Sequence, residues 1–195
     1  MLRKGMFLAD RYEILEQIGT GGMSDVYRAK CHKLNRFVAI KVLKKEYSED
    51  KTFVSKFRAE AQAAAGLTHP NIVNVYDVGD ENGIYYIVME LVEGITLKKY
   101  IEKKGKIPYK EAVSIAIQVA KGMQAAHSHH IVHRDIKPEN IFVSRFGEFK
   151  LGDFGIAREL DRSMSGLSKK GTFSYMAPEM YKGEEYDARV DIYSL

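Results

Sequence analysis

The hydrophobic pattern of this sequence changes near residue 92, and that change constrains its fold more than any other feature. Before that point, β-branched and aromatic residues come in short runs separated by glycines, a pattern typical of strands. It predicts three antiparallel strands within 11–43 and two more strands at 72–78 and 84–91. Between these two groups, apolar residues at helical spacing predict one helix over 53–67.

After residue 92 the pattern becomes mainly helical. Pro108 suits the first turn of a helix that runs to about His127 and is apolar over most of its circumference, so we expect this helix to be buried. Two short strand-like segments follow at 141–143 and 149–151. The stretch 153–178 is rich in Ser, Gly and Lys and predicts a long loop, which in a compact domain is usually functional.

These elements predict an α+β protein with two lobes joined by a tight hinge. We expect residues 1–92 to form a five-stranded antiparallel sheet with one helix, and residues 93–195 to form a mainly helical, incomplete lobe. The final segment 191–195 is apolar and has no capping residue or terminating glycine, so we expect the fold to continue past it.

Composition excludes several classes of protein. With 45% hydrophobic and 29% charged residues, the chain should fold as an ordinary globular domain. Cys31 is the only cysteine, so an internal disulfide is impossible and a reducing, cytoplasmic compartment is favoured. The chain has no apolar run long enough to span a membrane and no secretory signal, so we expect no membrane contact in this segment.

The net charge of +4 is concentrated in one stretch. Residues 98–110 hold six lysines and one glutamate, a local net charge of +5. Such a stretch is more often a solvated helix side than a nucleic-acid interface, which needs a broad basic face and a reading motif. We therefore expect no nucleic-acid partner.

A glycine-rich turn is the first candidate site. It consists of Gly19, Thr20, Gly21, Gly22, Met23 and Ser24. Its backbone amides could approach phosphates, although an ordinary tight turn is an equal alternative. A dinucleotide-binding fingerprint would need a third glycine where Ser24 stands and a helix directly after it, whereas Val26 begins a strand-like run.

Lys41 stands at the end of an otherwise apolar strand. A buried lysine needs a partner, and Glu60 on the following helix is a natural one. The alternative is a surface lysine whose stem is buried and whose ammonium reaches solvent.

Residues 133–140 place a base, two cations and a metal-capable amide in eight residues, a density that is hard to explain structurally. Asp153 follows across a hairpin, so its carboxylate and the Asn140 carboxamide can converge on one hard cation. These residues predict Mg²⁺ and a nucleotide. The histidine cluster His127, His129, His130 and His133 has no nearby Cys and no spaced second group, which disfavours zinc.

Together with Ala177-Pro178-Glu179, these motifs resemble a eukaryotic-type (Hanks-type) protein kinase catalytic domain in their order and spacing. The run Gly21-Gly22-Met23 and the segment 69–73 most resemble bacterial Ser/Thr receptor kinases, including those with extracellular PASTA repeats. The resemblance implies a bilobal kinase fold, ATP and Mg²⁺ as cofactors, and Ser/Thr-containing proteins as substrates. It also implies a parent protein that could be anchored in the membrane by a single span.

The resemblance implies how ATP is held. Lys41, held by Glu60, would bind the α- and β-phosphates, while Asn140 and Asp153 would hold Mg²⁺. Six residues would contact adenine, two of them through backbone groups at the hinge, although these positions suit core residues equally. They are Val26, Ala39, Met89, Glu90, Val92 and Phe142.

The resemblance also implies the catalytic groups. Asp135 would orient the substrate hydroxyl and accept its proton, and Lys137 would neutralise charge on the γ-phosphate. Thr172 would contact both and, with Lys137, indicates the Ser/Thr branch of the family. His133 would have a packing role, in a stack formed with Ala64, Val75 and Phe154 on Asp191.

Regulation is predicted from charge. The cations Lys56, Arg134 and Arg158 could converge on a phosphate, so we expect phosphorylation within the loop 153–178 to order it. The candidate phosphosites are Ser163, Ser165 and Ser168. A purely solvated loop is the alternative.

Ser24, in place of the usual third glycine, is a departure from the family pattern, and we expect a working loop nonetheless. The family fold also has further helices after the one that contains Asp191. Without them, an apolar surface of the second lobe would be exposed and would favour self-association, for example as a homodimer.

Two rival functions are a nucleotide-binding pseudokinase scaffold and a small-molecule phosphotransferase. The first would be expected to lose Lys41, Asp135 or Asp153, all of which are present, and the long loop 153–178 disfavours the second.

Overall fold

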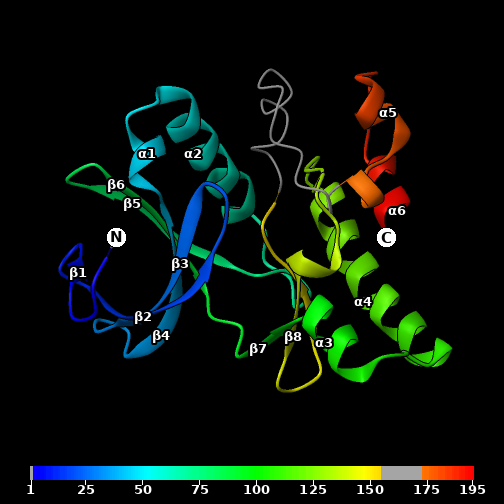
Figure 1. Ribbon diagram of the computed structural model, residues 1–195, viewed down its shortest axis with the longest axis horizontal. Coiled ribbons are helices and arrows are strands. Elements are labelled where there is room, and N and C mark those ends of the chain that lie inside the picture. Colours follow the sequence, from blue (N-terminus) through cyan, green and yellow to red (C-terminus); the bar gives the residue numbers. More distant parts are fainter. Residues whose placement is uncertain (1, 155–172) are drawn as a thin grey trace. The chain divides into compact units, whose positions relative to one another are not determined.

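The computed structural model describes residues 2–154 and 173–195. The chain divides into two compact units (Figure 1). The first unit is Met1–Ala65 with Asn74–Leu91, and the second is Gly66–Val73 with Val92–Leu195. The division after Leu91 lies one residue before the predicted boundary. The segment 66–73 belongs to the second unit because Val73 N–H donates to Leu151 O at 2.7 Å and Ile72 forms a parallel bridge with Leu151.

The first unit is built on one antiparallel sheet with the strand order β1-β2-β3-β4-β6-β5. Its strands are β1 (Phe7–Leu8), β2 (Tyr12–Thr20), β3 (Ser24–Cys31), β4 (Arg36–Leu43), β5 (Val75–Glu81) and β6 (Ile84–Glu90). The three antiparallel strands expected within 11–43 are confirmed. The expected total of five strands is wrong, because the two-residue β1 pairs with the start of β2 and is too short to leave a sequence pattern.

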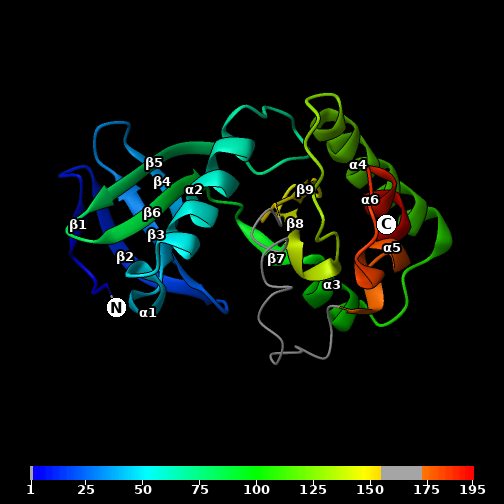
Figure 2. The same ribbon diagram turned by 90° about the horizontal axis from the view of Figure 1, so that it is seen from above.

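Alternation along the strands gives this sheet two apolar faces. Ile40 on β4 and Val88 on β6 face a cluster with Tyr12 and Ile14, whereas Leu43 and Ile87 pack with a helix on the other face. That helix is α2 (Lys51–Ala65), which contributes Phe57 and Ala61 and lies against the sheet in Figure 2. A four-residue helix, α1 (Lys45–Ser48), precedes it, so the expectation of one helix is also corrected. The alternation explains why α2 covers only one face.

The β5–β6 hairpin is tighter than expected. The strands expected at 72–78 and 84–91 leave five residues for the turn, yet β5 continues to Glu81. The turn needs only Asn82 and Gly83, which have φ values of 51° and 78°. Two consecutive left-handed residues are the backbone that joins antiparallel strands with least distortion, and Asn-Gly adopts it readily.

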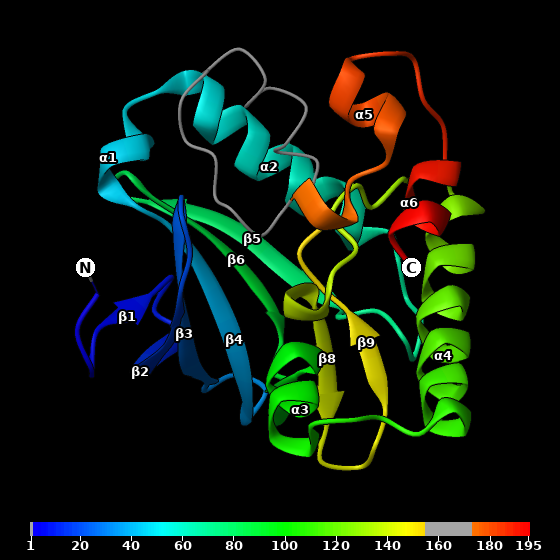
Figure 3. The ribbon, with the colours of Figure 1, turned by 45° about the vertical axis from the view of Figure 1, so that its right-hand side comes forward.

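The second unit combines a three-stranded antiparallel sheet with helices (Figure 3). Its strands are β7 (Gly94–Thr96), β8 (Ile141–Ser144) and β9 (Phe149–Leu151), in that order in the sheet. Its helices are α3 (Leu97–Lys104), α4 (Tyr109–His127), α5 (Pro178–Lys182) and α6 (Arg189–Ser194), with short 3₁₀ turns η1 (Pro138–Asn140) and η4 (Phe173–Tyr175). β8, β9 and α4 confirm the expected segments. No helix within the described residues is long and apolar enough to cross a membrane.

The core of the second unit lies between one face of α4 and the β8–β9 hairpin. Ile115, Val119 and Met123 on α4 pack with residues such as Leu151. The opposite face of α4 is solvent-exposed in the described part of the chain, where Val113 is 53% exposed. The expectation that α4 is buried holds for this one face only, because the packed neighbours leave its opposite apolar side uncovered.

Candidate functional site

The glycine-rich turn is a hairpin between β2 and β3. Gly21 N–H donates to Ser24 O at 2.7 Å, which closes the turn. The Lys44 ammonium donates to Gly21 O at 2.6 Å and to Gly22 O at 3.2 Å. Two carbonyls are thereby tied to a residue just past β4, which restrains the tip of the hairpin. Sequence reasoning missed Lys44, because nothing in the local pattern links it to a turn more than twenty residues earlier.

The predicted pairing of Lys41 with Glu60 is present. The distance from Lys41 Nζ to Glu60 Oε1 is 2.6 Å, and the two side chains are only 12% and 11% exposed. Lys41 lies on β4 and Glu60 on α2, so the sheet and its covering helix each fix one partner. A largely desolvated pair is strongly coupled, because removing one partner leaves a buried charge.

The six predicted adenine contacts are divided between the two units. In the first unit, Ala39 pairs with Met89 in the β4–β6 ladder. The Glu90 carboxylate accepts from Asn74 Nδ2 at 2.8 Å, and the Glu90 N–H donates to Asn74 O at 2.8 Å. Val26 lies on β3 opposite Lys41. The other two, Val92 and Phe142, lie in the second unit, both partly buried.

The segment 133–140 forms a polar cluster around Asp135. Its Oδ2 lies 2.8 Å from Lys137 Nζ and accepts from Asn140 Nδ2 at 2.8 Å. The same amide donates to Asp135 O at 2.9 Å. Asn140 N–H donates to Lys137 O at 2.9 Å in the η1 turn, which gives the loop its tight curvature. The local sequence thus places a carboxylate, an ammonium and a carboxamide within contact of one another.

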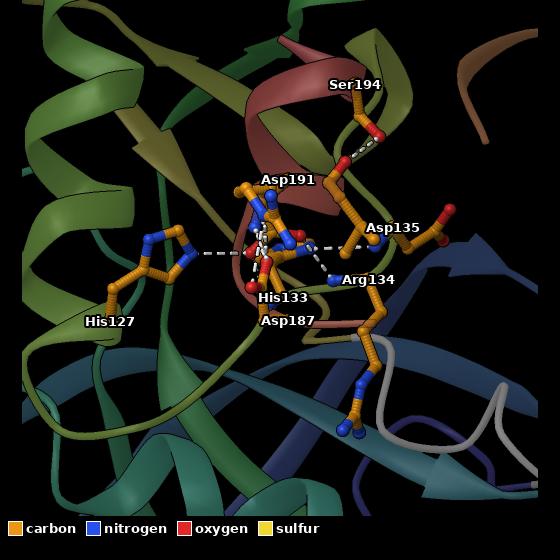
Figure 4. A network of polar contacts seen from close by, with 9 residues as sticks. His127, His133, Arg134, Asp135, Asp187, Asp191 and Ser194 are labelled. Carbon is orange, nitrogen blue, oxygen red and sulfur yellow. Dashed lines mark hydrogen bonds and ion pairs between the residues drawn. The ribbon is translucent and has the colours of Figure 1, made fainter. Parts of the chain in front are cut away.

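A buried aspartate on α6 holds this loop by its backbone (Figure 4). Asp191 is 0% exposed, and its Oδ2 and Oδ1 accept from the backbone N–H groups of His133 and Arg134, each at 2.7 Å. His127 on α4 donates through Nε2 to Oδ2 at 2.8 Å. Arg134 has a φ of 67°, a left-handed backbone conformation that is rare for a residue other than glycine and is found at the point where both N–H groups converge on one carboxylate.

His133 is neutral, and its tautomer follows from its partners. Its Nδ1 accepts from Asp135 N–H at 3.3 Å, so the proton is on Nε2, which donates to Gly152 O at 3.0 Å. Burial lowers the pKa of His133. The ring packs on Phe154 with centroids 4.6 Å apart. His133 therefore has a structural role beside Phe154 and Asp191, as the resemblance implied. Its expected stacking with Ala64 and Val75, which belong to the first unit, stays a prediction.

Asp153 follows Gly152 at the end of β9. Gly152 N–H donates to Asn140 O at 2.9 Å. This hydrogen bond brings the residues that follow strand β9 beside the loop that carries Asn140. A Cβ at Gly152 would lie 2.7 Å from the Phe142 ring, so glycine permits this close approach. Asp153 is exposed and has a φ of 54°, a strained conformation that is enriched at functional sites.

Several predicted residues lie outside the described part of the chain. These are Arg158, Ser163, Ser165, Ser168 and Thr172. Of the other proposed regulatory cations, Lys56 is 6% exposed, with its ammonium 4.9 Å from the centre of the Phe53 ring. His127, seen in the sequence only as part of a histidine cluster, is a further residue whose role was missed. The one available signal in the sequence is that His127 lies six residues before His133. This spacing indicates a shared partner only once the structure shows that α6 places Asp191 beside both residues.

Comparison with known proteins places this arrangement in a family. A sequence model described as the protein kinase domain matches residues 12–195. A probable serine/threonine-protein kinase of Clostridium perfringens is 50% identical over 98% of this chain and 28% of its own length. The serine/threonine-protein kinase PrkC of Bacillus subtilis is 46% identical over 98% of this chain and 30% of its own length.

The solved structures agree with the sequence relatives. The crystal structure of the Mycobacterium tuberculosis PknI kinase domain has a TM-score of 0.80 and 29% identity, over 100% of this chain and 74% of that one. The present chain thus spans about three tenths of the length of the curated relatives cited above. The family match over nearly the whole sequence and the catalytic-loop geometry lead to one conclusion: the chain belongs to the protein kinase domain family.

Proposed function

We propose that this chain transfers the γ-phosphate of ATP to serine and threonine hydroxyls of proteins, with Mg²⁺ as cofactor. The observation that carries the proposal is the contact of Asp135 with both Lys137 and Asn140 on one loop. Membership in the kinase family and the names of the relatives support it. Because the chain spans less than a third of those relatives, the activity of the whole protein is part of the proposal.

Asp135 acts as the catalytic base. Its carboxylate is held by the Asn140 amide and is 14% exposed, so it is placed but still open to a substrate. It orients the acceptor hydroxyl and takes its proton as the phosphoryl group is transferred. Lys137, 2.8 Å from the same carboxylate, then offsets the negative charge on the transferring group.

Lys41 binds the α- and β-phosphates of ATP. Its ammonium is fixed by Glu60 rather than free to rotate in solvent, so less entropy is lost when it meets a phosphate. The glycine hairpin contributes backbone N–H groups, and its tip is restrained by Lys44. The six adenine contacts implied by the resemblance stay predictions: Val26, Ala39, Met89, Glu90, Val92 and Phe142.

Asn140 and Asp153 fit a magnesium ion. The Asn140 amide nitrogen is used by Asp135, while its carbonyl oxygen Oδ1 makes no hydrogen bond with any described residue. An amide oxygen and an exposed carboxylate are hard ligands of the kind that Mg²⁺ takes together with substrate phosphates. When bound, the ion neutralises charge on the phosphates. The three candidate phosphosites and Thr172 stay predictions.

The test is transfer of radiolabel from γ-labelled ATP to a generic Ser/Thr-containing protein in the presence of Mg²⁺, followed by phosphoamino-acid analysis. Asp135→Asn keeps the shape of the side chain and should slow transfer at least about a hundredfold, because the base is lost. Asp187→Asn is the matched control, since that side chain is 59% exposed and, among the described residues, contacts Arg189 two positions along.

Nucleotide binding is measured in parallel as a thermal shift with MgATP. The proposal predicts labelled serine or threonine, unchanged transfer by the Asp187 variant and retained nucleotide binding in the Asp135 variant. Nucleotide binding without transfer by the unaltered chain would favour a pseudokinase scaffold. Equal transfer by the Asp135 variant would remove that residue from the reaction.

A further inference from the structure

A dense group of exposed lysines covers α3 and the connection to α4. This group, called here the α3 lysine face, consists of Lys98, Lys99, Lys103, Lys104, Lys106 and Lys110, all solvent-exposed. Lys98 pairs with Glu139 and Lys104 with Glu111. The other four make no ion pair with any carboxylate that the structure describes. Together with Glu102, which is exposed on the same helix, these carboxylates leave the six lysines a net charge of +3.

Helix stability explains only part of this charge. Lys103 and Lys104 lie in the last turn of α3, where the helix dipole favours cations. Lys98 and Lys99 lie in the first turn of α3, which contains no acidic residue, and Lys110 lies in the first turn of α4. Cations there are opposed by the dipole. Lys99 and Lys103 are also four residues apart on one helix, a spacing at which like charges repel.

The face is fixed next to the catalytic loop within the same unit. Leu97, Tyr100 and Ile101 turn the other side of α3 into the core. Lys98 Nζ lies 2.9 Å from Oε1 of Glu139, a residue of the η1 turn that also contains Asn140, and Figure 3 shows α3 next to this turn. From Lys98 to Lys104 the lysines extend along the helix for about 9 Å, given 1.5 Å per residue.

We propose that the α3 lysine face is a docking surface for an acidic segment of the protein substrate. The inference rests on the proposed kinase function and adds a substrate class to it: proteins that carry several Asp or Glu residues at a distance from the acceptor. An extended segment of about three residues would span the lysines of α3, at roughly 3.3 Å per residue. Each carboxylate would meet an ammonium that has no carboxylate partner in the described chain.

Two other anionic partners fit less well. The apolar side chains of α3 are turned into the core, so the helix has no free apolar face with which to enter a lipid surface. The face contains lysines and no arginine, whereas nucleic-acid phosphates are typically recognised by both, with base contacts beside them. A docking surface beside the catalytic loop would hold a protein substrate close to the catalytic residues, an advantage that a lipid or nucleic-acid partner would not gain.

The experiment uses two fluorescent peptides with the same Ser/Thr acceptor sequence, one followed by an Asp/Glu tract and the other by a Ser/Gly tract of equal length. Fluorescence anisotropy measures binding, and labelled ATP measures transfer. The test variant reverses three unpaired lysines of the face: Lys99→Glu, Lys103→Glu and Lys110→Glu. The control variant makes the same charge change at exposed lysines of the first unit: Lys4→Glu, Lys33→Glu and Lys45→Glu.

Binding of the acidic peptide should weaken about tenfold or more in the test variant, and about twofold or less in the control, at low salt. The difference should shrink as salt shortens the Debye length from about 30 Å at 0.01 M to about 8 Å at 0.15 M. In the transfer assay the acidic tract should lower KM and leave kcat nearly unchanged. Circular dichroism verifies folding, and Lys→Gln at the same three positions provides a milder second variant.

Equal binding of both peptides, or equal weakening in both variants, would overturn the docking proposal while leaving the kinase proposal intact. Binding that depends on the face, without any transfer, would leave docking intact and contradict the kinase proposal. Vesicles of phosphatidylserine and phosphatidylcholine and a short single-stranded oligonucleotide are tested on the same variants. If the vesicles or the oligonucleotide bind more tightly than the acidic peptide, and if this binding depends on the α3 lysine face, the docking proposal is wrong and that partner is the ligand of the face.

Discussion

Replacing Asp191 by asparagine isolates the contribution of one buried carboxylate to the catalytic loop. The side chain is 1% exposed, and each of its oxygens accepts a backbone N–H at 2.7 Å, from His133 and from Arg134. Asparagine has almost the same shape but only one acceptor oxygen and no charge. One of the two loop N–H groups must therefore face an amide NH₂ group, and the surviving hydrogen bond loses its charge assistance.

The magnitude follows from these two losses. A buried donor left without an acceptor costs about 1–3 kcal/mol, and the loss of charge assistance on the other bond about 1 kcal/mol more. The free energy of unfolding should fall by about 2–4 kcal/mol, a large fraction of the roughly 5–15 kcal/mol that stabilises a typical domain. The loop that carries Asp135 should loosen first, because its backbone is what Asp191 holds.

Urea unfolding followed by circular dichroism measures the loss of stability, and hydrogen exchange measures protection of the His133 and Arg134 amides. Asp187→Asn on the same segment is the control, and its exposed side chain should cost less than about 1 kcal/mol. If Asp191→Asn changes stability no more than this control and leaves both amides protected, the loop is not held by the carboxylate and the reasoning is refuted.

Three further predictions concern stability, measured by urea unfolding. Gly122→Ala should destabilise the fold by about 1–3 kcal/mol, since the new Cβ would lie 2.6 Å from a backbone carbonyl; Gly66→Ala, with nothing within 4 Å, should not. Because burial lowers the pKa of His133 below its ordinary 6.5, stability should be full above that pH and fall as pH decreases. His133→Phe should flatten this dependence between pH 7 and 5, and an unchanged slope would contradict the assignment. Tyr12→Phe should cost about 1 kcal/mol by removing the 2.8 Å hydrogen bond to Asp77, and no loss would show that bond to be inconsequential.

Features that depend on neighbouring residues were predictable from the sequence. The strands within 11–43 follow from β-branched runs and glycines, and α2 from its apolar spacing. The grouping of Asp135, Lys137 and Asn140 follows from their closeness in the chain, because a tight turn of eight residues leaves few ways to separate them. The family resemblance, now shown by the match over 12–195, extended this local information to roles.

Features that depend on residues far apart in the sequence were decided by the tertiary structure. The hydrogen bond from His133 N–H to Asp191 spans 58 residues, and the bond from His127 to the same carboxylate spans 64. Lys44 reaches back to the glycine hairpin in the same way. The sequence of α4 is apolar on several sides, so it did not show which side faces the core. Packing against β8 and β9 determines that side. The periodicity of a sequence shows which side of a helix or strand is apolar. It does not show which other segment packs against that side, because the choice of segment is determined by the free energy of the whole fold.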